Sequence, residues 1–119
     1  MPDIRTLLWV GSSKRDLITF PDEVQQEVGF ALHQAQIGEE SSNAKALKGF
    51  GGRGVLEIVE RYDGDTYRAV YTVRLKAGVY VLHCFQKKAK RGNETPKADM
   101  DLIKSRLREA EKDDASETE

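Results

Sequence analysis

Runs of alternating or helically spaced apolar residues divide this chain into seven predicted elements. Segments rich in β-branched and aromatic residues, bounded by turn-forming residues, predict strands at 4–10, 55–62, 66–75 and 79–86. Apolar residues that recur every three or four positions predict helices at 13–19, 21–37 and 96–111. The last helix follows Thr95 as its N-cap and carries an apolar stripe of Met100, Ile103, Leu107 and Ala110.

Both connections among the last three strands have the composition of tight turns. Asp63-Gly64-Asp65 follows the first strand and Lys76-Ala77-Gly78 follows the second, which predicts an antiparallel meander. Residues 39–54 are polar and glycine-rich, and we expect them to form a mobile connector. The order β-α-α-β-β-β-α predicts an α+β fold. We expect a small antiparallel sheet with an N-terminal helical hairpin and a C-terminal helix, all packed against one face.

Length and composition indicate an ordinary globular protein. We expect a single domain over residues 1–112 and an acidic, disordered tail at 113–119. No apolar run approaches the roughly 20 residues that span a bilayer, and the N-terminus does not resemble a secretory signal. The single cysteine, Cys84, excludes an internal disulfide, and its apolar strand predicts a buried, inert thiol. We therefore expect a cytoplasmic protein.

The net charge of −1 hides an uneven distribution. Residues 41–98 carry 12 basic and 5 acidic side chains, whereas residues 1–40 and 99–119 each have a net charge of −4. Four cations, Lys87, Lys88, Lys90 and Arg91, lie within five residues at the end of an apolar strand. Folding gains nothing from crowding like charges, so a polyanionic partner is the natural explanation. The pattern favours a local nucleic-acid site, and RNA above DNA.

Alternation along the strands adds two arginines to this group. Arg68 shares one predicted face with Val70, Thr72 and Arg74, and it could converge there with Arg61 and the loop lysines. The alternative interpretation is that both arginines are solvated or pair with an acidic neighbour. The possible acidic partners are Glu57, Glu60 and Asp65.

Such a group suits RNA cleavage by attack of a 2′-hydroxyl on the adjacent phosphate. This reaction needs a base, charge stabilisation of the phosphorane-like transition state and a proton donor for the leaving oxygen. Arg68 is the candidate stabiliser because a guanidinium stays charged and binds phosphate oxygens in pairs. Lysine acts as a base only when its pKa falls, and neighbouring cations such as those around Lys87 and Lys88 have that effect. No metal or other cofactor is predicted.

His83 and the glycine-rich loop provide weaker candidates. His83 shares a predicted face with Val79, Val81 and Phe85, which favours a core histidine, although its closeness to Lys87 keeps it a candidate general acid. Lys48 and Arg53 lie on the loop at 48–54, which either extends toward RNA or is a plain connector.

The segment DTYRAVYTVRLKAGVYVLHCFQKKAKRGNETPKADMDLIKSRL resembles the RelE/HigB superfamily of bacterial toxins, and above all its phage-derived HigB-like branch. The resemblance implies a RelE-like fold, and a type II toxin made with a small antitoxin, often a helix-turn-helix protein. It also implies an mRNA interferase that cleaves messenger RNA on the ribosome. The lack of a long apolar run separately predicts that no membrane is a partner. By position, Arg68, Lys87 and Lys88 match the basic site residues of the family, and Lys48 and Arg61 match further contacts.

Three features depart from the pattern of that superfamily, and one of them is the overall acidity, which is unusual for a ribosome-binding toxin. The turn at 93–96 replaces a tyrosine that some relatives place near the final helix, and Glu57 and Glu60 stand where a lysine pair is expected. Two alternatives therefore stay open. One is a non-catalytic toxin that binds DNA gyrase, related to the ParE toxins, and the other is a non-toxic, phage-derived binding module.

Overall fold

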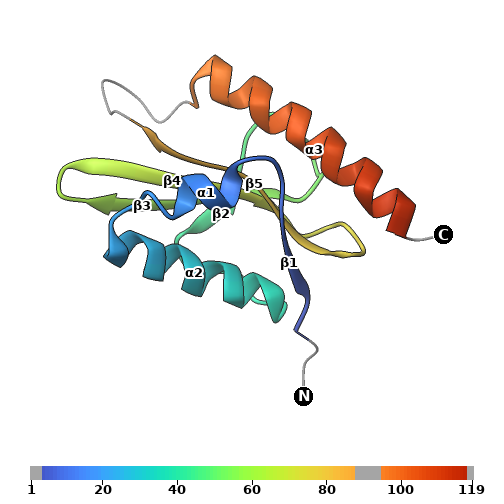
Figure 1. The fold of residues 1–119 in the computed structure, drawn as a ribbon, viewed down its shortest axis with the longest axis horizontal. Helices are drawn as coiled ribbons and strands as arrows, with labels where there is room; N and C mark the ends of the chain where they lie inside the picture. Colours follow the sequence, from blue (N-terminus) through green and yellow to red (C-terminus); the bar gives the residue numbers. More distant parts are fainter. Residues whose placement is uncertain (1–3, 88–94, 118–119) are drawn as a thin grey trace.

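The computed structural model describes residues 4–87 and 95–117, and its sheet lies between helices on both faces (Figure 1). The elements in chain order are β1 (Thr6–Trp9), α1 (Ser13–Leu17), α2 (Asp22–Gln36), β2 (Ala44–Ala46), β3 (Val55–Tyr62), β4 (Asp65–Thr72), β5 (Gly78–Lys87) and α3 (Lys97–Glu117). The α+β class is confirmed, and the predicted helices and strands are present with shifts of a few residues at most ends.

The sheet has the strand order β1-β5-β4-β3-β2. β3, β4 and β5 form the predicted antiparallel meander, and Asp63 and Gly64 link β3 to β4 with φ values of 51° and 82°. Two successive residues with positive φ are typical of a hairpin turn whose twist matches that of the strands. The prediction of a purely antiparallel sheet is wrong, because β1 pairs with β5 in parallel. The composition of a turn indicates how the two strands that it connects will pair. It carries no information about β1 and β5, which are far apart in the sequence.

β2 lies inside the segment predicted to be a connector. Its three residues pair antiparallel with β3, where Lys45 lies opposite Glu57. A strand this short has no readable alternation, so only its position beside β3 reveals it. Two apolar residues of the loop that follows, Leu47 and Phe50, are buried against the sheet.

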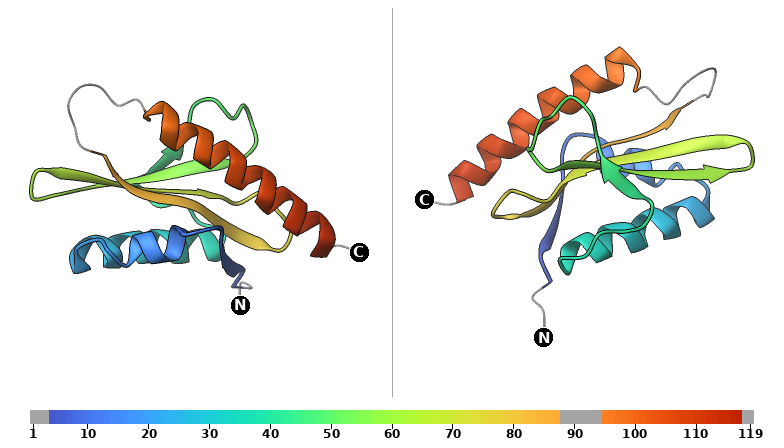
Figure 2. Two further views of the ribbon diagram at one scale, coloured as in Figure 1. Left: turned by 45° about the horizontal axis from the view of Figure 1, so that its top comes forward. Right: turned by 180° about the vertical axis from the view of Figure 1, so that it is seen from behind.

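Helices cover both faces of the sheet, and the prediction that they share one face is wrong (Figure 2). α1 and α2 pack on the face that includes Ile58, Ala69 and Tyr71, which we call the α2 face. α3 packs on the face that includes Val70 and Leu82, which we call the α3 face. The predicted stripe of α3 is confirmed, since Ile103, Leu107 and Ala110 are buried there.

A β-bulge in β5 changes which side chains reach the α3 face. Val70 pairs with His83 whereas Tyr71 pairs with Val81, so Leu82 is an additional residue without a direct partner on β4. Such an insertion reverses the alternation beyond it. His83 therefore shares the α3 face with Phe85, and the predicted grouping of His83 with Val79 and Val81 is wrong.

α3 continues to Glu117, well past its predicted end. Asp113 accepts a hydrogen bond from the Tyr80 hydroxyl at 2.7 Å, and Asp114 accepts one from the Ala77 backbone N–H at 2.6 Å. Hydrogen bonds from the backbone N–H groups of Lys76 and Ala77 hold the pKa of Asp114 below its ordinary value. The prediction of a disordered tail is therefore wrong for residues 113–117.

Within residues 4–87 and 95–117, none of the helices combines the length and the apolar character needed to cross a membrane.

The parallel contact between β1 and β5 depends on a glycine. Changing Gly78 to alanine is expected to lower the free energy of unfolding by about 1–3 kcal/mol, because the added Cβ would clash with the Thr6 backbone oxygen. Gly29→Ala is the matched control: its Cβ would meet nothing within 4 Å, and alanine favours the helix by about 0.5–1 kcal/mol. Urea denaturation measures the free energy of unfolding of both variants. An unchanged midpoint for Gly78→Ala would contradict the steric argument.

A side chain from α3 contacts the backbone of the bulge. The guanidinium of Arg106 donates to the Leu82 carbonyl and to the Ser12 hydroxyl, each at 2.9 Å. Arg106→Ala removes both donors and is expected to cost about 1–3 kcal/mol of unfolding free energy. Arg108→Ala, an exposed arginine two residues away, should change it by less than about 0.5 kcal/mol. Equal denaturation midpoints for the two variants would show that the bulge does not need this support.

Candidate nucleic-acid interface

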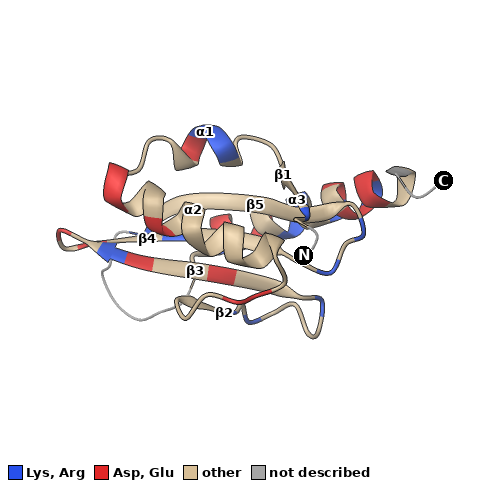
Figure 3. Cartoon of the chain, turned by 90° about the horizontal axis from the view of Figure 1, so that it is seen from below, with Lys and Arg blue, Asp and Glu red and all other residues tan. Residues whose placement is uncertain are grey.

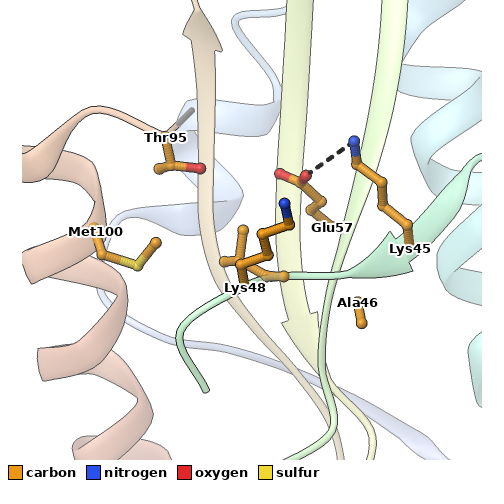
Figure 4. Close-up of a pocket in the computed structure, with 7 residues that line it drawn as sticks. Lys45, Ala46, Lys48, Glu57, Thr95 and Met100 are labelled. Atoms are coloured by element: carbon orange, nitrogen blue, oxygen red, sulfur yellow. Dashed lines mark ion pairs between the residues drawn. The ribbon is translucent and has the colours of Figure 1, made fainter. Parts of the chain in front are cut away.

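A pocket of about 500 Å³ opens on the α3 face, between β2, the loop after it, β3 and the start of α3. Its lining residues are Lys45, Ala46, Leu47, Lys48, Glu57, Thr95 and Met100. Figure 4 shows Glu57 in its centre, with Lys45 on one side and Thr95 on the other, and Lys48 extends toward the same carboxylate. The pocket therefore combines one acidic group with two basic ones.

Glu57 and Arg68 form a buried ion pair behind this pocket. The Arg68 Nη1 atom lies 2.9 Å from Glu57 Oε2, and each side chain is only 4% exposed. They come from neighbouring strands and lie diagonally, because Glu57 pairs with Val70 and Arg68 with Val59. Removing two charges from water is costly, and only their close pairing makes this burial tolerable. The alternative interpretation of Arg68 as an ion-pair partner is confirmed.

Each member of this pair has a further feature that bears on binding. The Oε1 atom of Glu57 lies 3.6 Å from the Lys45 ammonium, whose side chain is 56% exposed. The Nε atom of Arg68 is buried and has no hydrogen-bond partner among the described residues. A buried donor without an acceptor is unusual in a folded protein. With respect to residues 4–87 and 95–117, Arg68 therefore keeps an unused hydrogen-bonding site.

Strand register assigns two further predicted residues, Arg61 and Lys87, to the same face as Arg68. Neither lines the pocket with Glu57, and Arg61 lines a second pocket beside Glu27 of α2. Arg61 and Lys87 both pair with Thr66, so β3, β4 and β5 place them on the same rung of the sheet. Arg61 is exposed, whereas Lys87 is buried. The bulge makes this arrangement possible, since an uninterrupted alternation would turn Lys87 to the α2 face. β3 carries both acidic and basic positions along its length (Figure 3).

Other predicted site residues lie elsewhere or outside the described part. Lys88, Lys90 and Arg91 fall outside the described residues. Arg53 donates to both carboxylate oxygens of Glu111 on α3, at 2.8 and 2.9 Å, which holds its side chain at the helix and away from the pocket lining. Lys48 is the member of the predicted loop pair that lines the pocket.

His83 is engaged on both ring nitrogens. Its Nε2 atom lies 2.7 Å from Asp99 Oδ1 at the start of α3, and its Nδ1 atom lies 3.5 Å from Arg106 Nη1. The donor and acceptor roles of the two ring nitrogens follow from the tautomer, and Arg106 can only donate in its contact with Nδ1. The ring also stacks on Phe85 with centroids 4.6 Å apart. These contacts favour a structural role, and the proton-donor role stays a prediction.

The thiol of Cys84 lies on the face opposite the pocket. Cys84 is buried on the α2 face, and burial, aided by the charge of Asp16, raises the pKa of its thiol to about 12. A thiol with that pKa is a poor nucleophile at neutral pH, as its apolar strand predicts. Among the described residues, no cluster of three or more His, Cys, Asp or Glu side chains has the arrangement of a metal site.

Sequence reasoning missed Lys45 and undervalued Glu57. Lys45 belongs to β2, which has no strand signal of its own. Glu57 has the same parity as Val55, a buried residue of the α3 face, so alternation places its carboxylate on that face. The arrangement as a whole offers guanidinium and ammonium groups to an anion in a half-open pocket.

Comparison with known proteins adds a family to this geometry. The family model described as Phage derived protein Gp49-like (DUF891) matches residues 15–108, from α1 into α3. No match was found among curated proteins or among solved structures. The matched family is associated with the toxins of toxin–antitoxin systems. Because the match covers most of the sequence, this chain belongs to the Gp49-like family of phage-derived proteins.

Proposed function

We propose that this protein is the toxin of a type II toxin–antitoxin system and cleaves messenger RNA on the ribosome as a metal-independent endoribonuclease. Membership of the Gp49-like family supports the toxin role. The likeness of its strands to the RelE/HigB superfamily supports RNA as the target. A five-stranded mixed sheet with three helices is compatible with a RelE-like fold.

The convergence of cations at one end of the α3 face is the observation that carries the proposal. Arg68 lies behind the pocket, Lys45 and Lys48 line it, and Arg61 and Lys87 lie on the neighbouring rung. These residues come from β2, the loop after it and all three strands of the meander. Cations that separate elements place on one face form a local site for a polyanion, even though the net charge of the chain is −1.

The proposed reaction is a transesterification within RNA. The 2′-oxygen loses its proton to a base and attacks the adjacent phosphorus, and the bond from phosphorus to the 5′-oxygen breaks. The departing 5′-oxygen takes up a proton, so the products are a 2′,3′-cyclic phosphate and a 5′-hydroxyl. Arg68 stabilises the charge on the phosphorane, and Lys87 and Lys88 are the candidates for proton transfer.

The proposed partners are messenger RNA, the ribosome and a small antitoxin, and the proposed location is the cytoplasm. An antitoxin that covers the cationic end of the α3 face with acidic or bulky groups would block RNA access. Purified toxin–antitoxin complex should therefore be inactive, and retained cleavage of RNA by the complex would contradict this arrangement.

Induced expression followed by mapping of transcript ends tests the proposal. Wild type should stop growth and produce new 5′ ends within messages. Arg68→Lys should reduce cleavage at least about 10-fold, because lysine keeps the charge beside Glu57 but loses the paired donors. Lys48→Ala should also reduce cleavage, although less, since Lys48 is exposed and acts only as one cation at the pocket.

Lys14→Ala is the matched control for Lys48→Ala. Lys14 is an exposed lysine of α1, which packs on the opposite face of the sheet, and its loss should leave cleavage unchanged. Growth arrest with intact transcripts and a DNA-damage response would instead indicate a gyrase-binding toxin. The absence of any growth phenotype would indicate a non-toxic binding module.

A further inference from the structure

We propose that the carboxylate of Glu57 occupies the position of an RNA phosphate and must release Arg68 before RNA can bind. This inference rests on the proposed function, because it assigns the ligand class and a form of self-inhibition to the same site. Glu57 then acts as an internal competitor of the substrate, and the RNA-binding surface is partly closed in the absence of RNA.

The first argument is the set of groups around the carboxylate. Arg68 Nη1 lies 2.9 Å from one oxygen of Glu57, and Lys45 Nζ lies 3.6 Å from the other. Lys48 extends toward the same carboxylate from the loop (Figure 4). A carboxylate and a phosphodiester are interchangeable ligands for such cations, because both present two anionic oxygens to a guanidinium fork. The position that Glu57 fills is therefore an anion site.

The second argument is that Glu57 satisfies Arg68 incompletely. The hydrogen bond from Arg68 to Glu57 runs through Nη1, while its buried Nε has no acceptor among the described residues. A guanidinium binds an oxyanion best through two parallel N–H groups. A phosphate has enough oxygens to accept from Nε and from an Nη atom together. Arg68 consequently has more to offer a phosphate than Glu57 uses.

The third argument concerns access. Glu57 lines the pocket, whereas Arg68 does not belong to the lining and is only 3% exposed as a residue. A phosphate that enters the pocket therefore meets the negative carboxylate before it reaches the guanidinium. The buried carboxylate of Glu57 repels an entering phosphate, so the resting arrangement opposes RNA binding.

Lys45 supplies a place for the displaced carboxylate. It lies on β2 directly opposite Glu57, and its ammonium is already within ion-pair distance. A small rotation of Glu57 toward Lys45 would exchange one cationic partner for another. Neither Glu57 nor Arg68 would then be left buried without an opposite charge, a state that is strongly destabilising.

The test compares binding of a 2′-O-methyl RNA oligonucleotide, which cannot be cleaved, to wild type and to Glu57→Gln by fluorescence anisotropy. Glutamine keeps an oxygen that can accept from Arg68 but carries no charge. Glu57→Gln should bind the oligonucleotide about 10-fold more tightly than wild type. The double variant Glu57→Gln, Arg68→Lys should lose that gain, because the liberated guanidinium is then absent.

Glu60→Gln is the matched control. Glu60 lies on the same strand as Glu57, and its replacement by glutamine changes the charge by the same amount. Its side chain lies on the α2 face, and it accepts a hydrogen bond from Asn43, which precedes β2. Burial, together with the charge of Glu27 on α2, raises the pKa of Glu60 above its ordinary value. Its replacement should alter RNA affinity by less than about 2-fold. Equal gains for Glu57→Gln and Glu60→Gln would reduce the effect to net charge and overturn the inference.

A measurement on wild type covers the case in which Glu57→Gln does not fold. The nitrogen resonance of Arg68 Nε and the carboxyl resonance of Glu57, followed by NMR, should both shift as the oligonucleotide saturates the protein. Unchanged resonances at saturation, or no RNA binding by any form, would overturn the inference. Tight RNA binding without cleavage would be consistent with the inference about Glu57 and would contradict only the endoribonuclease proposal. If wild type cleaves RNA but Glu57→Gln binds the oligonucleotide no more tightly, the endoribonuclease proposal stands and the inference about Glu57 is overturned.

Discussion

The buried ion pair between Glu57 and Arg68 makes one end of the α3 face charged, whereas the rest of that face is apolar. Most of that face is apolar, with Val55, Val70 and Leu82 buried under α3 and the loop after β2. The pair introduces two charges among these residues, and each is tolerable there only because the other is present. Its position beside the start of α3 leaves the Glu57 carboxylate in a pocket wall. One interaction therefore links β3 to β4 and shapes the site.

The bulge at Leu82 is the second constraint, because it decides which side chains accompany that pair. By reversing the alternation of β5, it turns His83, Phe85 and Lys87 to the α3 face. Arg106 donates to the carbonyl of the bulged residue and also reaches His83, whose other nitrogen faces Asp99. A local irregularity of one strand is thus tied to two points on α3. The helix and the cationic residues are positioned together.

The acidic C-terminal segment has a structural use. Asp99, Glu111, Asp113 and Asp114 each contact a group on the sheet or its loops, namely His83, Arg53, Tyr80 and the Ala77 backbone. These contacts are spread along the helix, from its first turn to its last, and fasten α3 across the face. The charge asymmetry of the sequence therefore has two parts: cations that converge near the pocket, and acids that anchor the helix beside them.

The sequence by itself determined the meander, the long second helix, the apolar stripe of α3 and the basic character of β4 and β5. These features depend on interactions between near neighbours, such as alternation along a strand, helical spacing and the Asp63-Gly64 turn, which a linear pattern records. Arg68 and Lys48 could be selected in the same way. The family resemblance also followed from residues that are contiguous in the chain.

Only the tertiary structure decided the parallel pairing of β1, the existence of β2, the placement of α3 on the opposite face and the bulge. Each depends on residues far apart in sequence: Thr6 beside Gly78, Lys45 beside Glu57, and Arg106 beside Leu82. The site shares this origin, because the meeting of Lys45 with Glu57 is a long-range contact and the partner of Arg68 was one of three acids that the sequence allowed. The sequence shows which side chains carry a charge, but the packing of the folded chain selects the partner of each buried charge.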